Sequence, residues 1–155
     1  MSISIEILND SQAEAYEALL LSDETNLLYA SYKFQVFLKR ILSDSQPFYL
    51  TAWQDGQLVG ALPTFVRYNV KHGNVLNSLP FYGSNGGIII SPTVPDKTAV
   101  KHALLDAFHE LARVHKVVVS TLITNPLDRE RAFYEAQLPY QWRDERIGQI
   151  THLPE

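Results

Sequence analysis

The residues best suited to chemistry lie in segment 78–92, Ser-Leu-Pro-Phe-Tyr-Gly-Ser-Asn-Gly-Gly-Ile-Ile-Ile-Ser-Pro. Its glycines and asparagine adopt positive φ cheaply, so the backbone can present free N–H groups to a ligand. Aromatic side chains stand beside them, and small-molecule sites combine these two features. A plain turn between two strands is the simpler alternative. The predicted substrate-binding residues of this loop are Tyr82, Gly83, Ser84, Asn85, Gly86 and Gly87.

Ser84 is a possible nucleophile, but its surroundings argue against a serine hydrolase. The sequence around it reads Tyr-x-Ser-x-Gly, whereas a nucleophile elbow needs Gly-x-Ser-x-Gly and a helix after the serine. Here a strand-like run follows. The phosphate-binding and dinucleotide-binding glycine motifs are also missing from the sequence. We therefore predict no cofactor and leave the catalytic residue unassigned.

His102, Asp106 and His109 lie at i, i+4 and i+7 of a predicted long helix and could in principle approach one metal ion. They occupy the polar face of that helix. An ordinary solvated face explains them better, so we predict no metal site.

Arg67 begins a second polar cluster, which also contains Tyr68, Lys71 and His72. Such a cluster suits a carboxylate or phosphate group on a ligand. A polar loop between strands is the simpler alternative. We retain Arg67 as a candidate substrate-binding residue.

The composition narrows the function further. The chain of 155 residues fits one domain, and it has no cysteine, which removes disulfides and thiolate chemistry. A net charge of −4 with dispersed basic residues argues against direct nucleic-acid binding by this chain alone. No leader-like segment or membrane-spanning apolar run is visible, so we expect a soluble cytoplasmic protein. Hydrophobic residues make up 46% of the chain and charged residues 19%, which hints at a surface covered by another domain or subunit.

The N-terminal third predicts one strand and two helices. Residues 3–8 alternate apolar and polar as a half-buried strand does. Ser11 to Glu14 has the pattern of a capping box, followed by a helix that buries Tyr16, Leu19 and Leu20. A second helix is expected after Ser31. Its apolar stripe would be Phe34, Phe37, Leu38 and Ile41.

The central third predicts an antiparallel hairpin. Residues 48–53 and 58–68 are strand-like, and Asp55-Gly56 between them is a strong signal for a two-residue turn. Pro63 cannot donate a ladder hydrogen bond, so we expect an edge or a bulge there. Further strands are expected at 75–81 and 87–91, on either side of the glycine loop.

The last third predicts a βαβ unit. Asp96 would cap a helix over 97–115, and strand 117–123 would then run parallel to strand 88–91. That last strand is almost wholly apolar, as a strand buried on both faces would be. Asn125-Pro126 would start a final helix ending near Ala136. The tail from Gln141 to Leu153 resembles one more strand.

The order of these elements, together with the motifs, resembles the FemAB-like branch of the GNAT acyltransferase superfamily. The resemblance rests on the Asp55-Gly56 hairpin running into Leu58-Val-Gly-Ala-Leu-Pro63, on Ser78-Leu-Pro-Phe-Tyr82 with Gly86-Gly87, and on the 97–115 helix. The helix from Tyr32 also resembles the family's early aromatic helix, with Phe37 where a tryptophan is expected. Tyr32 is therefore a further candidate substrate-binding residue, on a helix that would form one wall of the cleft.

The resemblance implies a GNAT-like mixed α/β (α+β) fold, with a mostly antiparallel sheet and helices on both faces. It also implies that residues 1–155 form a single GNAT-like domain similar to the N-terminal half of a two-domain FemAB-like protein. The best-known members transfer amino acids from aminoacyl-tRNA to peptidoglycan precursors. In such proteins the acceptor cleft lies on the first domain, which would give Tyr82, Gly86 and Gly87 an acceptor-side role.

Two classes of function follow. The first is the acceptor-binding part of an acyl- or aminoacyltransferase, acting on a small-molecule or peptide-like acceptor together with a second GNAT-like domain or another subunit. The second is a non-catalytic ligand-binding or scaffolding module. The Gln/Arg-x-x-Gly-x-Gly/Ala loop that binds pyrophosphate in acetyl-CoA-dependent GNAT enzymes is absent. We therefore expect no acetyl transfer by this chain alone.

Overall fold

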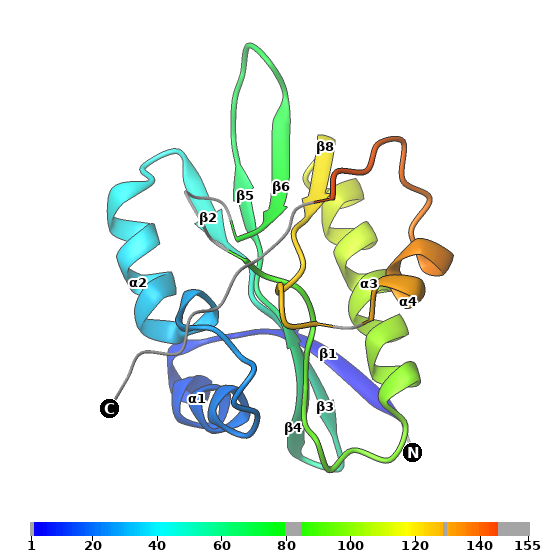
Figure 1. The fold of residues 1–155 in the computed structure, drawn as a ribbon. Coiled ribbons are helices and arrows are strands. Elements are labelled where there is room, and N and C mark those ends of the chain that lie inside the picture. Colours follow the sequence, from blue (N-terminus) through cyan, green and yellow to red (C-terminus); the bar gives the residue numbers. More distant parts are fainter. Residues whose placement is uncertain (1, 80–84, 129, 146–155) are drawn as a thin grey trace, which may run out of the picture.

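The computed structural model describes residues 2–79, 85–128 and 130–145 (Figure 1). Within them the chain forms two small sheets with helices on both sides, α1 and α2 on one side and α3 and α4 on the other. The mixed, mostly antiparallel architecture predicted from the sequence is therefore confirmed.

The strands are β1 (Ile3–Ile7), β2 (Ser45–Pro47), β3 (Leu50–Gln54), β4 (Gln57–Leu62), β5 (Phe65–Arg67), β6 (Asn74–Ser78), β7 (Ile89–Ile90) and β8 (Val117–Leu122). The α-helices are α1 (Ala13–Leu21), α2 (Tyr32–Ile41), α3 (Lys97–Val114) and α4 (Arg131–Gln137). Two short 3-10 helices are η1 (Asp10–Gln12) and η2 (Leu28–Ala30).

The two sheets have the strand orders β1-β3-β4-β7 and β2-β5-β6-β8. The paired strands are antiparallel except for β6 and β8, which are parallel. Two passages from one sheet to the other run through α-helices, β1 to β2 and β7 to β8, and three do not, β2 to β3, β4 to β5 and β6 to β7. The passage from β6 to β7 contains the glycine-rich loop.

The predicted hairpin is present, and its turn has the expected backbone. Asp55 and Gly56 have φ of 49° and 77°, the two successive positive values of a type I′ turn. The expectation at Pro63 was wrong. The strand changes sheets between β4 and β5 there, while the β3–β4 pair has its bulge at Val59. Thr64 helps to fix the crossing, because its backbone carbonyl accepts from Phe48 N at 2.9 Å.

Two apolar cores cover opposite faces of the sheets. Val100, Leu104, Phe108 and Leu111 of α3 pack on β3, β4 and β6 in one core. Tyr16, Leu19 and Leu20 of α1 and Leu38 of α2 pack on the other face, against β4 and β5. The two cores therefore fix the strands on either side of the glycine loop.

The two N-terminal helices occur where the sequence predicts them, with two corrections. The capping box uses Asn9 and Gln12 rather than Ser11 and Glu14, because Asn9 Oδ1 accepts from Ser11 N and Gln12 Oε1 accepts from Asn9 N. Ser31 caps α2 as expected. The predicted apolar stripe of α2 is only partly buried, since Phe37 and Ile41 are exposed.

The βαβ prediction was partly wrong. The helix α3 begins after Asp96, whose carboxylate accepts from Ala99 N at 2.9 Å. The following strand, β8, runs parallel to β6 and not to β7, which pairs antiparallel with β4 in the other sheet. Nor is β8 buried on both faces. It lies at a sheet edge, and Val118 and Val119 are 63% and 55% exposed.

The C-terminal part also differs from the prediction. Asn125 and Pro126 form a turn, in which Asn125 O accepts from Asp128 N at 2.9 Å, and α4 begins only at Arg131. Residues 141–145 contain no strand, and the rest of the predicted tail strand lies outside the described residues. No helix in the described ranges is long and apolar enough to cross a membrane.

Candidate functional site

The two sheets separate where β6 ends. Ser78 is the last residue of β6, and its Oγ accepts a hydrogen bond from Ile123 N at 2.8 Å. After the glycine loop, Gly86 N donates to Ile123 O at 2.9 Å. The chain then forms β7 against β4 instead of continuing along β8. The end of β8 and the start of β7 therefore diverge around Ile123, and this divergence is the centre of the candidate site.

Two glycines lie at this divergence, and each is needed there for a different reason. A Cβ on Gly86 would lie 2.8 Å from the carbonyl oxygen of Ser78, so Gly86 is needed for close approach of two backbones. Its φ is not positive, which corrects the sequence-based expectation. Gly87 does have a positive φ of 93°, and its backbone packs on Thr124. Part of the glycine signal is thus structural.

Leu79 marks the point where the loop leaves β6. It is fully buried and has a φ of 58°, a conformation that large side chains rarely adopt. Backbone strain of this kind concentrates at functional sites. The strained residue directly follows Ser78, so it supports placing the candidate site at this crossing.

Tyr134 of α4 lies against the start of the chain that leaves the divergence toward β7. Its hydroxyl accepts a hydrogen bond from Ile88 N at 3.2 Å and lies next to the carboxylate of Asp128. Burial raises the pKa of the Tyr134 phenol far above its usual range, so the hydroxyl keeps its proton. Burial also raises the pKa of Asp128. The sequence reading missed both residues, because only the fold brings α4 next to Ile88.

A surface pocket of about 550 Å³ lies beside the divergence, between α1 and the start of α2. Four leucines and three acidic residues line it, together with Asn26, Ser31 and Lys33. The leucines are Leu20, Leu21, Leu27 and Leu28, and the acids are Glu17, Asp23 and Glu24. Hydrogen bonds from Thr25 lower the pKa of Asp23, which keeps that carboxylate charged. The lining therefore combines apolar side chains with three acidic residues and one lysine.

One hydrogen bond connects the pocket to the divergence. Asn125, which follows β8, donates from its side-chain amide to Thr25 O at 2.7 Å. Thr25 lies between Asp23, Glu24 and Asn26 of the pocket lining. The loop that forms the pocket is thus fastened to the end of β8, and the pocket and the divergence are neighbours.

The start of α3 is arranged differently from an anion-binding helix end. Asp96 places its own carboxylate over the first turn, where it accepts from Ala99 N. An acidic cap satisfies a free N–H group and repels a second anion. Pro95 and Thr93 precede it and line a smaller cavity of about 360 Å³ next to the Asp55 turn.

The predicted site residues are not all brought together. Tyr82, Gly83 and Ser84 lie outside the described residues. Asn85, Gly86 and Gly87 lie at the divergence. Tyr32 donates from its hydroxyl to Asp10 Oδ1 at 2.7 Å, and Arg67 pairs with Asp44 at 2.7 Å. Their partners thus lie in η1 and just before β2.

The other polar residues singled out have structural surroundings. His102 packs edge-on against Phe133, with the ring centroids 5.5 Å apart. Within the described residues, no three histidine or acidic side chains gather as a metal site would require. Tyr68 shares a hydrogen bond of 2.9 Å with His115 Nδ1, and Lys71 N donates to Asn69 Oδ1 in a tight loop.

No protein-family model and no curated protein matches the sequence, but solved structures match nearly the whole chain. A ribosomal-protein-alanine N-acetyltransferase from Brucella melitensis biovar Abortus has a TM-score of 0.64 at 19% identity, covering 97% of this chain and 100% of that one. A GNAT family acetyltransferase from Staphylococcus aureus has a TM-score of 0.56 at 16% identity, covering 99% and 100%. The aminoglycoside acetyltransferase AAC(6')-Iy has a TM-score of 0.65 at 16% identity, also covering 99% and 100%. The chain has the GNAT acetyltransferase fold.

The GNAT fold confirms the broader part of the resemblance found in the sequence, and identities this low establish the fold alone. In this GNAT fold the loop that contributes Asp23, Glu24 and Asn26 to the pocket is joined to the end of β8 through Asn125. The FemAB-like branch and the site residues in the glycine loop remain predictions.

Proposed function

We propose that this chain is the acceptor-binding domain of an acyl- or aminoacyltransferase of FemAB type, acting on a cell-wall precursor or a similar peptide-like amine. A second GNAT-like domain or another subunit would supply the donor. The observation that carries the proposal is the pocket lined by three acidic residues, whose loop Asn125 fastens to the end of β8. This arrangement supports amine binding beside a site of transfer.

The charge of the pocket favours a cationic acceptor. Its lining contains three carboxylates and one lysine, and an alkyl ammonium group would gain from both the acids and the leucines. Acyl transfer requires the amine in its neutral form, so the bound ammonium must lose a proton before it attacks. The base that takes this proton is unassigned.

The acidic cap of α3 supports the idea that the acyl donor binds to another domain or subunit. Pyrophosphate binding at a helix N-terminus depends on free backbone N–H groups, and here Asp96 already occupies one of them with a negative charge. Several similar structures are aminoglycoside acetyltransferases, and one of these is in complex with the bisubstrate analogue CoA-S-monomethyl-acetylneamine. Those enzymes show which chemistry this fold can host.

Isothermal titration with two matched peptides tests the proposal. We expect saturable binding of a peptide carrying a free lysyl amine, and at least tenfold weaker binding of the same peptide acetylated at that amine. Glu24→Gln should weaken binding of the free amine. The control Glu14→Gln removes the same charge from the first turn of α1, outside the pocket lining, and should leave binding unchanged.

A second titration, with acetyl-CoA, tests whether the donor is bound outside this chain. We expect no saturable binding at micromolar concentrations. A stoichiometric micromolar complex would contradict the acceptor-domain proposal, and equal binding of the two peptides would contradict the pocket assignment.

A further inference from the structure

The helix α4 is too short to be stable by itself. It has seven residues, and its N-cap residue Glu130 makes no side-chain capping hydrogen bond. Isolated helices below about 12 residues are marginal in water, so α4 depends on contacts with the rest of the molecule. Whatever makes those contacts also positions Tyr134, the residue of α4 that reaches the candidate site.

The inner side of α4 has three such contacts. The hydroxyl of Tyr134 accepts from Ile88 N. Lys101 of α3, with only 11% of its side chain exposed, pairs with Glu130 at 2.8 Å. The same ammonium group lies 5.0 Å from the ring centre of Phe133. These contacts connect α4 and its N-cap to α3 and to Ile88.

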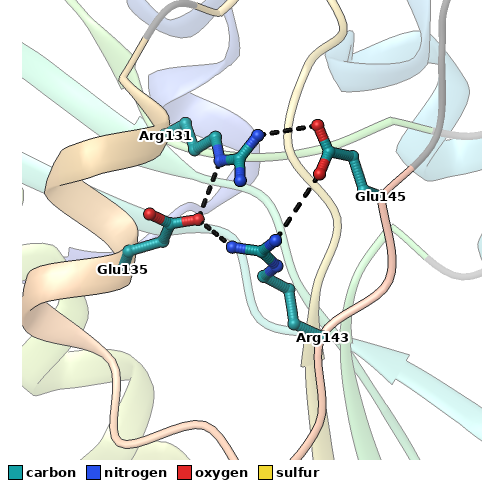
Figure 2. Close-up of polar contacts among 4 residues, drawn as sticks. All are labelled: Arg131, Glu135, Arg143 and Glu145. Atoms are coloured by element: carbon teal, nitrogen blue, oxygen red, sulfur yellow. Dashed lines mark hydrogen bonds and ion pairs between the residues drawn. The ribbon is translucent and has the colours of Figure 1, made fainter.

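The outer side of α4 has a closed ring of ion pairs, which we name the clasp: Arg131, Glu135, Arg143 and Glu145 (Figure 2). Arg131 Nε pairs with Glu135 Oε1 at 2.7 Å along the helix, and Arg131 Nη1 pairs with Glu145 Oε1 at 2.6 Å. Arg143 pairs with both Glu135 and Glu145, the latter at 3.5 Å. Charges alternate around the ring.

Two members of the clasp belong to α4 and two belong to the segment that follows it. Each guanidinium contacts both carboxylates, so loss of one residue breaks two of the four pairs. The clasp therefore holds residues 143–145 against the outer side of α4 while Tyr134 holds its inner side.

We propose that Arg143 and Glu145 are positioning residues for the candidate site, acting through α4 on the contact between Tyr134 and Ile88. Displacing residues 143–145 then weakens the hydrogen bond from Ile88 N to the Tyr134 hydroxyl, next to Gly87. The proposal concerns this mechanical coupling and does not depend on the identity of the acceptor.

The size of the effect follows from exposure. All four clasp side chains are partly exposed, between 33% and 60%. Exposed ion pairs typically shift an equilibrium by less than about fivefold each, and salt screens them. Two or more pairs acting on a helix of seven residues should change its local opening by roughly three- to tenfold.

Hydrogen exchange of the Ile88 amide measures this opening directly, because that amide donates to Tyr134. We expect exchange roughly three- to tenfold faster at low ionic strength in the double variant Arg143→Gln with Glu145→Gln. The single variant Arg143→Lys keeps the positive charge and leaves Glu145 in place. It should retain most of the protection that Ile88 has in the unaltered chain. The matched control is Arg113→Gln with Glu110→Gln, an exposed ion pair at the far end of α3. It should leave Ile88 unchanged.

Salt supplies a second measurement that needs no variant. Raising NaCl to about 1 M should bring Ile88 exchange in the unaltered chain close to that of the double variant. Exchange that is the same in both chains at low salt would overturn the proposal. So would an equal change in the control variant, because the clasp would then affect only general stability.

Discussion

Asn125 donates a hydrogen bond to the backbone carbonyl of Thr25 across 2.7 Å, joining two residues that are 100 positions apart in the chain. The same side chain accepts from Leu127 N at 3.0 Å through its oxygen. The amide group thus has two separate tasks. Its oxygen shapes the turn before α4, and its nitrogen fastens the pocket loop to β8.

The substitution Asn125→Asp separates these tasks. The carboxylate keeps an oxygen for Leu127 N but has no donor for Thr25 O. We expect faster amide exchange in residues 23–26 and at least a threefold loss of affinity for the lysyl peptide, for a hydrogen bond worth about 1 kcal/mol. Asn125→Ala should loosen the loop equally and also disturb the turn. A pocket loop as protected as before would show that this contact does not fasten it.

Gly86→Ala tests the close approach at the divergence. The new Cβ would lie 2.8 Å from Ser78 O, so the backbone has to move, at a cost of about 2 kcal/mol or more. The comparison is Gly56→Ala, where space is open and only the positive φ of 77° opposes a side chain. That change should cost about 1 kcal/mol. Urea denaturation measures both, and a smaller loss at Gly86 than at Gly56 would contradict the packing argument.

Tyr49→Phe should leave the protein as stable as before or make it more stable, by up to about 1 kcal/mol. The Tyr49 hydroxyl is buried and has no hydrogen-bond partner among the described residues. Tyr16→Phe is the matched control. Its hydroxyl donates to Ala30 O at 2.6 Å, so its loss should cost about 1 kcal/mol. Thermal unfolding of the pair distinguishes the two, and equal losses would mean that Tyr49 has an unseen partner.

Asp128→Asn predicts a specific pH dependence. Burial raises the pKa of Asp128 above its usual 3.8, so the folded state binds this proton more tightly than the unfolded state does. The charged carboxylate therefore costs stability at neutral pH, and that cost disappears as pH falls through the raised pKa. Asparagine should stabilise the protein at pH 7 and lose this advantage in acid. An advantage that grows in acid would reverse the assigned direction.

The sequence was most informative where a residue determines its own backbone. Asp55 and Gly56 form the predicted turn because both adopt positive φ within a two-residue loop. Asp96 caps α3 because its side chain reaches its own first turn. Such features depend on neighbours a few positions away, so they can be recognised without knowledge of the fold.

The candidate site was predicted less well, because it depends on long-range pairing. Nothing local distinguishes β6 from β7 as the partner of β8, and the structure selects β6 through the contact of Ser78 with Ile123. Asn125 resembled a helix cap, yet it shapes a turn through Leu127 N and also binds Thr25, which no local pattern indicates. Tyr134 looked like one more aromatic residue until the fold placed it on Ile88. The glycine loop alone indicated the right region.

The contact between Ser78 and Gly86 makes the start and the end of the glycine loop neighbours in space. A loop whose ends already touch does not have to span any distance, so its length is free to change without displacing β6 or β7. Lengthening such a closed loop costs little, about 0.6 kcal/mol for each doubling. Ser78 and Gly86 therefore act as two fixed anchor points. Insertions between these two anchor points should therefore leave β6 and β7 in place, provided that Leu79 keeps its position in the core.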